Sequence, residues 1–259
     1  MLEVRNLTKI YADGTRALTD VSFTVKPREF LIVIGLSGSG KSTLLRCINR
    51  LVEPTEGEVV VNGANTTTAR PKELREIRRT IGMVFQQFNV VKRLNVVTNV
   101  LAGRLGYSDR WRSLTGFSRD DRIAAESALA RVGMGELSRK RASELSGGQQ
   151  QRVGIARALA QKPSLILADE PVASLDPVLA HTILNYLEEL NQNEGITILC
   201  SLHYLDLVQR YATRVIGLRE GRLVFEGTAE EIRAISDAQF RQIYGEDAER
   251  IGAATVSEE

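Results

Sequence analysis

The sequence predicts an α/β fold whose central β-sheet is mostly parallel, with an all-helical insert. Three features of the 259-residue chain predict it. Short apolar segments of strand character alternate with helical segments, a glycine-rich phosphate-binding pattern joins one strand to the following helix, and no strand pattern appears from about Asn95 to Ala160. Parallel strands need crossover connections, usually helices, so we expect helices on both faces of the sheet.

The first part of the chain consists mainly of strands. Residues 1–11 alternate between apolar and polar side chains, and apolar strands follow at 21–25, 30–35, 57–63 and 81–86. The strand at 57–63 ends in Asn62-Gly63, a dipeptide typical of a two-residue hairpin turn. A helix interrupts these strands after Gly40.

The helical insert has its clearest pattern near its centre. Ala125, Ala128, Leu129 and Val132 fall at i, i+3, i+4 and i+7, which places them on one face of a helix. Ser118 and Asp121, three residues apart, resemble a capping box at the start of this helix, preceded by a loop at 106–118.

Strands return in the last third of the chain. They are expected at 164–169, 195–200, 214–218 and 222–227, with a helix beginning after Asp176-Pro177 between the first two. Thr228 and Glu231 form another capping-box pattern, after which the tail is expected to be helical and then polar.

Composition excludes several classes of protein. A net charge of +2, with arginines scattered along the chain, gives no indication of a nucleic-acid partner. The two cysteines, Cys47 and Cys200, have no metal-ligand spacing and are expected to be buried, inert thiols. The first residues lack the apolar core of a secretory signal, and no apolar run approaches the ~20 residues needed to span a bilayer, so we expect a soluble, cytoplasmic protein.

The segment GLSGSGKST matches the phosphate-loop pattern G-x-x-x-x-G-K-[ST] and lies between a strand and a helix. Its glycines let successive backbone N–H groups point at phosphate oxygens, and the following helix adds its positive end. Lys41 is expected to reach the β- and γ-phosphates, and Ser42 to ligate Mg²⁺. The expected nucleotide contacts here are Gly35, Leu36, Ser37, Gly38, Ser39, Gly40, Lys41, Ser42 and Thr43.

The segment LILADE provides the second half of the predicted site. Four apolar residues indicate a buried strand, and Asp169 follows at its carboxyl end, where open α/β sheets bind ligands. We expect Asp169 to hold Mg²⁺ through water and Glu170 to act as the general base on the attacking water. Together the two segments predict an ATP hydrolysis site.

A second anion-binding loop, LSGGQ at 145–149, lies about a hundred residues after the first. With this motif, nearly the whole chain resembles the ATPase subunit of ABC transporters. The resemblance implies one ABC ATPase domain: a P-loop core at 1–94 and 161–259 that includes an antiparallel β-subdomain, and a helical signature subdomain at 95–160.

The resemblance also implies roles for isolated residues. Tyr11 would stack on adenine, Gln86 would sense Mg²⁺ and the γ-phosphate, Asp176 would belong to the D-loop, and His203 would be the catalytic switch. Each has a structural alternative: Tyr11 as a strand-end aromatic, Gln86 as a surface amide, and His203 as a core histidine. His181 matches no family motif and is expected to be a solvated helix residue.

In the family, the LSGGQ loop binds the γ-phosphate held by a second subunit, which explains why one chain carries two anion-binding loops. The resemblance therefore implies a homodimer with two ATP molecules at its interface. Ser146, Gly147, Gly148 and Gln149 would complete the partner's site, with a helix from about Gln149 to Gln161 directing its positive end at the phosphate. Two transmembrane permease subunits would insert a short helix against Phe88, Val90, Val91 and Leu94, although these residues could equally be core.

Three segments narrow the resemblance to the ATPase subunits of phosphonate importers, which also serve phosphite and related oxyanions. They are VLAGRLGYSDRWRSLTGF, ADEPVASLDP and GLREGRLVFEG. Two residues depart from the family pattern: Ser201 stands where asparagine is expected, and Leu36 replaces the commoner proline. The implied protein is an ATP-hydrolysing translocase subunit, peripheral on the cytoplasmic face of the inner membrane, that works indirectly with a substrate-binding protein. Amino-acid importers, lipoprotein exporters, non-transport ABC ATPases and P-loop kinases are the alternatives.

Overall fold

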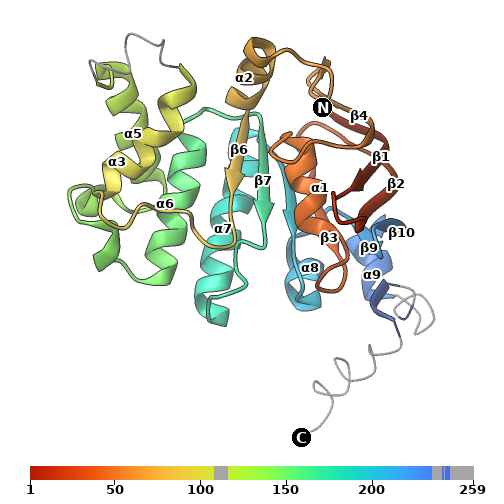
Figure 1. Ribbon diagram of the computed structural model, residues 1–259. Helices are drawn as coiled ribbons and strands as arrows, with labels where there is room; N and C mark the ends of the chain where they lie inside the picture. Colours follow the sequence, from red (N-terminus) through yellow and green to blue (C-terminus); the bar gives the residue numbers. More distant parts are fainter. Residues whose placement is uncertain (108–115, 235–240, 242, 246–259) are drawn as a thin grey trace, which may run out of the picture.

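A computed structural model of the chain describes residues 1–107, 116–234, 241 and 243–245 (Figure 1). Most of the loop expected at 106–118, and the end of the polar tail, lie outside the described residues. In Figure 1 the helical insert forms one side of the molecule, and the strands occupy the centre and the opposite side. No helix of the described part combines the length and apolar character needed to cross a bilayer.

The central sheet has six strands in the order β10-β9-β3-β8-β7-β6. The five strands from β9 to β6 run parallel, and β10 pairs with β9 in the antiparallel direction. The mostly parallel sheet predicted from the sequence is therefore confirmed. The strands are β3 (Phe30–Ile34), β6 (Ile81–Val84), β7 (Leu165–Asp169), β8 (Thr197–Ser201), β9 (Arg214–Arg219) and β10 (Arg222–Thr228).

Alternate residues of β3 pack into two different cores, because successive side chains of a strand point to opposite faces. Phe30, Ile32 and Ile34 join a cluster with helices of the insert and the carboxyl-terminal half. Leu31 and Val33 join a cluster with the first helix and the antiparallel strands. Burial on both faces explains why these strands appear in the sequence as uninterrupted apolar runs.

The second sheet is antiparallel, in the order β2-β1-β4-β5. Asn62 and Gly63 form the tight turn before its last strand, with positive φ angles of 51° and 80°. This pair of left-handed residues is what the predicted hairpin requires. The strands are β1 (Leu2–Ile10), β2 (Arg16–Val25), β4 (Glu56–Val61) and β5 (Ala64–Asn65).

The described part of 95–160 consists of helices joined by turns and irregular segments, and its only strand-type pairing is one isolated bridge between Asn95 and Arg141. The predicted capping box is present, since the Ser118 side chain accepts a hydrogen bond from the Asp121 N–H. The helix of the LSGGQ loop starts two residues earlier than expected, at Gly147. The elements are α3 (Val96–Leu101), η1 (Ala102–Tyr107), α5 (Arg119–Arg131), η2 (Gly135–Leu137), η3 (Ala142–Glu144) and α6 (Gly147–Leu159).

One helix, α2 (Pro71–Arg79), was not predicted from the sequence. Leu74 and Ile77 are its only apolar residues besides Pro71, too few for the repeat by which amphipathic helices are recognised, and only Ile77 is buried. Its signals were local: Pro71 at the first helical position, and Glu73, whose carboxylate accepts a hydrogen bond from the Arg70 N–H. The remaining helices are α1 (Lys41–Ile48), α7 (Pro177–Glu194), α8 (Leu205–Tyr211) and α9 (Ala229–Arg233).

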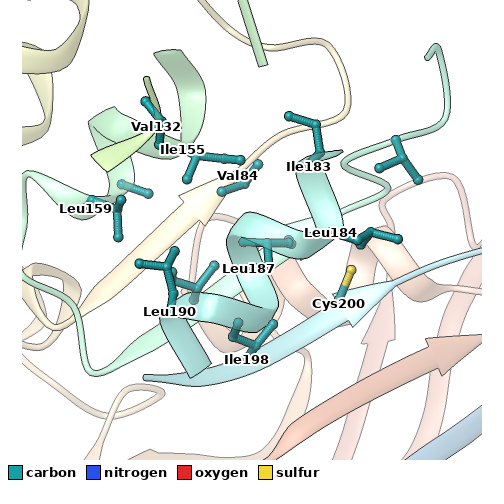
Figure 2. Close-up of a cluster of buried hydrophobic side chains, with 14 of the residues drawn as sticks. Val84, Val132, Ile155, Leu159, Ile183, Leu184, Leu187, Leu190, Ile198 and Cys200 are labelled. Carbon is teal, nitrogen blue, oxygen red and sulfur yellow. The ribbon is translucent and has the colours of Figure 1, made fainter. Parts of the chain in front are cut away.

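Helix α7 lies at the centre of the larger core (Figure 2). Its Leu187 and Leu190 pack with Ile198 of β8, while Ile155 and Leu159 reach the same cluster from α6. The insert and the parallel sheet therefore share one hydrophobic core.

Candidate nucleotide-binding site

The phosphate loop spans the end of β3 and the start of α1, as predicted. Two of its glycines have no room for a side chain. Gly35 has φ of 145°, and a Cβ atom there would lie 2.2 Å from the Leu218 carbonyl oxygen. Gly40 has φ of 105°, and its Cβ would lie 2.5 Å from the Ala17 carbonyl oxygen. Glycine is thus required both by the backbone conformation and by the close approach of β9 and β2.

Lys41 is buried at the base of this loop, with 3% of its side chain exposed. Its Nζ donates to the carbonyl oxygens of Gly35 at 2.8 Å and Leu36 at 2.9 Å, and lies 3.7 Å from the Glu170 carboxylate. Burial lowers the pKa of Lys41, while the charge of Glu170 acts in the opposite direction. The ammonium group is therefore held inside the loop beside a carboxylate.

Asp169 lies at the end of β7 with 1% of its side chain exposed. Its Oδ1 accepts a hydrogen bond of 2.7 Å from the Ser42 hydroxyl, and its Oδ2 lies 3.4 Å from Nη2 of Arg46. Arg46 was not among the predicted site residues. Its position four residues after Ser42, on the same face of α1, was the available signal.

Glu170 is held at the turn after β7 in a left-handed conformation, with φ of 46°. Its Oε1 is hydrogen-bonded to Nε2 of His203, and its backbone N–H donates to the Ser201 hydroxyl at 2.9 Å. The structure therefore brings Lys41, Asp169, Glu170 and His203 together at the carboxyl edge of the sheet. Ser201 is a further residue of this cluster that the site prediction missed.

An anion and a divalent cation both fit these residues. The Ser39 hydroxyl is buried and has no hydrogen-bond partner among the described residues, so a phosphate oxygen would satisfy it. Ser42 and Asp169 offer adjacent oxygen ligands, which suit Mg²⁺. Among the described residues no three His, Cys, Asp or Glu side chains are placed so that they could hold a metal ion together, so a magnesium ion there would take its other ligands from water or phosphate.

Two further predicted nucleotide contacts, Tyr11 and Gln86, lie on exposed segments. Tyr11 is 38% exposed, and its hydroxyl lies 3.3 Å from the Thr43 hydroxyl, next to the start of α1. Gln86 is exposed in the turn that follows β6. Beside the phosphate loop is an open pocket whose lining residues are Leu36, Ser37, Gly38, Ser39, Arg219, Glu220, Tyr244 and Gly245.

The LSGGQ loop is built as a second helix N-terminus. The Ser146 hydroxyl accepts from the Gln149 N–H at 3.3 Å, and the Gln149 side chain accepts from the Ser146 N–H at 3.0 Å. The first turn of α6 carries no acidic residue, whereas that of α5 carries Asp120 and Asp121. The positive end of α6 is thus available to an external anion.

A single chain does not bring its two anion-binding loops together. In Figure 1, β6 and β7 lie between α6 and α1, so the LSGGQ loop and the phosphate loop belong to different sides of the sheet. Asp176 is also exposed, and its side chain caps α7 by accepting from the Leu179 N–H at 3.0 Å.

The segment after Gln86 is partly exposed. Phe88 lies against Gly147, and Val90 packs on the larger core, whereas Val91 is 45% and Leu94 is 38% exposed. His181 is exposed on α7, as expected, and its Nδ1 lies 3.0 Å from the Tyr211 hydroxyl. Both cysteines are buried and free, as predicted.

Comparisons with known proteins agree with this arrangement. Residues 18–173 match the ABC transporter family. The chain is 51% identical to the phosphonates import ATP-binding protein PhnC of Bdellovibrio bacteriovorus over 97% of this chain and 96% of that protein. It is 48% identical to the protein of the same name from Staphylococcus saprophyticus, over 97% and 98%.

Among solved structures, the chain is similar to MJ0796, described as a bacterial ABC transporter cassette and solved as a dimer. The TM-score is 0.78 with 37% sequence identity, over 88% of this chain and 99% of that chain. A post-hydrolysis state of the same cassette, bound to ADP and Pi and also dimeric, gives a TM-score of 0.77.

Proposed function

Because this chain belongs to the ABC transporter family and is one of its ATP-hydrolysing transport ATPases, we propose that it drives uptake of phosphonate or a related phosphorus oxyanion. The substrate class rests on the relatives that are about half identical over nearly the whole chain and are named phosphonates import ATP-binding proteins. The observation that carries the ATPase role is the grouping of Lys41, Asp169, Glu170 and His203 beside the phosphate loop.

In this proposal Glu170 is the general base. His203 holds its carboxylate, and Lys41, 3.7 Å away, can exchange its loop carbonyls for phosphate oxygens. Ser42 and Asp169 hold Mg²⁺, which when bound neutralises charge on the phosphates. Gln86 would contact the same cation, and the exposed ring of Tyr11 would stack on adenine.

The working form is a homodimer. The separation of α6 from α1 within one chain supports this proposal, because a second copy related by a two-fold axis can place its Ser146 loop over the phosphate loop of the first. Gly147, Gly148 and Gln149 then contribute the positive end of α6 to the partner's nucleotide. Asp176, in the exposed turn before α7, would belong to the same interface.

Two transmembrane permease subunits dock on the segment after Gln86, at the inner face of the membrane. The exposed side chains of Val91 and Leu94 support this surface, since they are large, apolar and adjacent to the residues that contact the LSGGQ loop. A substrate-binding protein acts on the permease rather than on this chain.

A transport experiment tests the whole proposal. A strain whose native protein is replaced by the Glu170→Gln variant is assayed for uptake of methylphosphonate, phosphite, phosphate and an amino acid. We expect selective loss of methylphosphonate or phosphite uptake. The matched control is Glu126→Gln, the same change at an exposed position on α5. Normal uptake of all four compounds, with the variant still bound at the membrane, would refute the phosphonate assignment.

A further inference from the structure

Ser201 stands where the phosphonate-importer pattern leads us to expect asparagine, and the structure gives this residue a specific environment. It is the last residue of β8 and is completely buried. In the parallel pairing of β7 with β8, Ser201 is the partner of Asp169. The register of two neighbouring strands therefore places one hydroxyl beside the two acidic residues of the site.

The Ser201 hydroxyl makes two contacts with different chemistry. Its oxygen accepts the backbone N–H of Glu170 at 2.9 Å and lies 3.4 Å from Oδ1 of Asp169. An ionised carboxylate can only accept, so the hydroxyl hydrogen is donated to Asp169. Asparagine also offers a donor and an acceptor, so the expected family residue could make the same pair of contacts.

The hydrogen bond from the Glu170 N–H to Ser201 stabilises an unfavourable backbone conformation at Glu170. Glu170 has φ of 46°, a left-handed conformation that residues with a side chain rarely adopt. It follows the last residue of β7, so its N–H is outside the regular ladder and is satisfied by Ser201. This conformation directs the Glu170 carboxylate to His203 and to within 3.7 Å of Lys41.

We propose that Ser201 is a positioning residue for ATP hydrolysis, which acts by fixing the backbone and hence the carboxylate of Glu170. The proposal rests on the role of Glu170 as general base under the proposed function. Ser201 makes no hydrogen bond to the phosphate loop among the described residues. Removing its hydroxyl should therefore slow turnover without weakening ATP binding.

The test compares Ser201→Thr with Ser201→Val, because these side chains have nearly the same shape and differ in the hydroxyl. Steady-state phosphate release by the purified full-length chain gives kcat and KM for ATP. We expect the valine variant to lose kcat on the order of 10- to 100-fold, as for a small displacement of a catalytic group, with KM within about 2-fold. The threonine variant should keep kcat within about 3-fold of the natural protein.

Three further measurements make the result decisive. In a Glu170→Gln background the valine change should cause no additional loss, because the group that it positions is already gone. Ser201→Ala should reproduce the kcat loss if the valine variant does not fold. Ser164→Ala, a change at the opposite end of β7 where the hydroxyl bonds to Asn62, is the control and should leave kcat unchanged.

Equal kcat values for the threonine and valine variants would overturn the proposal. A full additional loss in the Glu170→Gln background would also overturn it, because Ser201 would then act through something other than Glu170. Failure of the natural protein itself to hydrolyse ATP would instead contradict the proposed function.

Discussion

Replacing Ser146 by alanine separates two roles that one hydroxyl has in this fold. The oxygen caps α6 by accepting from the Gln149 N–H, and the hydroxyl hydrogen has no acceptor among the described residues. At α5 the equivalent Ser118 also caps the helix, but its hydroxyl donates to Asp121 at 2.7 Å. Ser118→Ala is therefore a matched control that removes a cap without removing a donor to an external anion.

The expected magnitudes differ for the two roles. Loss of either cap should cost about 1 kcal/mol of unfolding free energy, which lowers Tm by roughly 2–4 °C in a chain of this size. A hydrogen bond to a charged phosphate contributes about 1.5–3 kcal/mol. A two-fold dimer contains two such bonds, so Ser146→Ala should weaken the ATP-bound dimer by about 3–6 kcal/mol, or roughly 10²- to 10⁴-fold in Kd.

Light scattering in ATP, with both variants made in a Glu170→Gln background that retains nucleotide, measures the dimer Kd. Thermal unfolding of the same samples measures the effect of each cap. The reasoning is refuted if the Ser146→Ala and Ser118→Ala proteins dimerise equally well. A loss of ATP affinity in the Ser146→Ala monomer would mean that the loop serves its own subunit.

Two further predictions concern stability, and one concerns ATP affinity. Leu187→Ala removes a completely buried side chain and should lower the free energy of unfolding by about 2–5 kcal/mol, as measured by urea titration. The control Leu51→Ala, at a half-exposed position, should lower it by less than about 0.5 kcal/mol. Gly40→Ala should prevent the phosphate loop from closing, because its Cβ would meet the Ala17 carbonyl oxygen at 2.5 Å; unchanged ATP affinity by calorimetry would contradict this. Burial raises the pKa of Cys47 from 9.0 to about 12 and also raises that of Cys200, so the unfolded chain loses these protons first. Stability should fall as pH rises above about 9, and the decline should be shallower when both cysteines are replaced by alanine.

The parts of the site that the sequence predicts well depend on contacts close in the chain. The phosphate loop needs only β3, six loop residues and the start of α1, and the predicted capping boxes at Ser118 and Thr228 each involve residues three apart. These interactions are confirmed because local geometry dictates them. The roles of Tyr11, Gln86, Asp176 and His203 toward nucleotide stay predictions.

Several contacts between segments that are distant in the chain could not be predicted from the sequence. Ser201 meets Asp169 and Glu170 only because β7 and β8 are paired in one register, and no local motif specifies that register. Arg46 approaches Asp169 across a gap of more than a hundred residues. Helix α2 was missed for a different reason, because charged residues cover most of its surface and only Ile77 is buried.

The core shared by α6, α7 and β8 limits how this protein can be taken apart or recombined. Val132, Ile155 and Leu159 would lose much of their apolar packing if the insert were cut out, since their neighbours Leu187 and Leu190 belong to α7 (Figure 2). A chimera that exchanges the insert between related transporters therefore has to exchange the facing side of α7 with it. The part of this fold that can be exchanged intact is a layer of packed helices rather than a continuous stretch of chain.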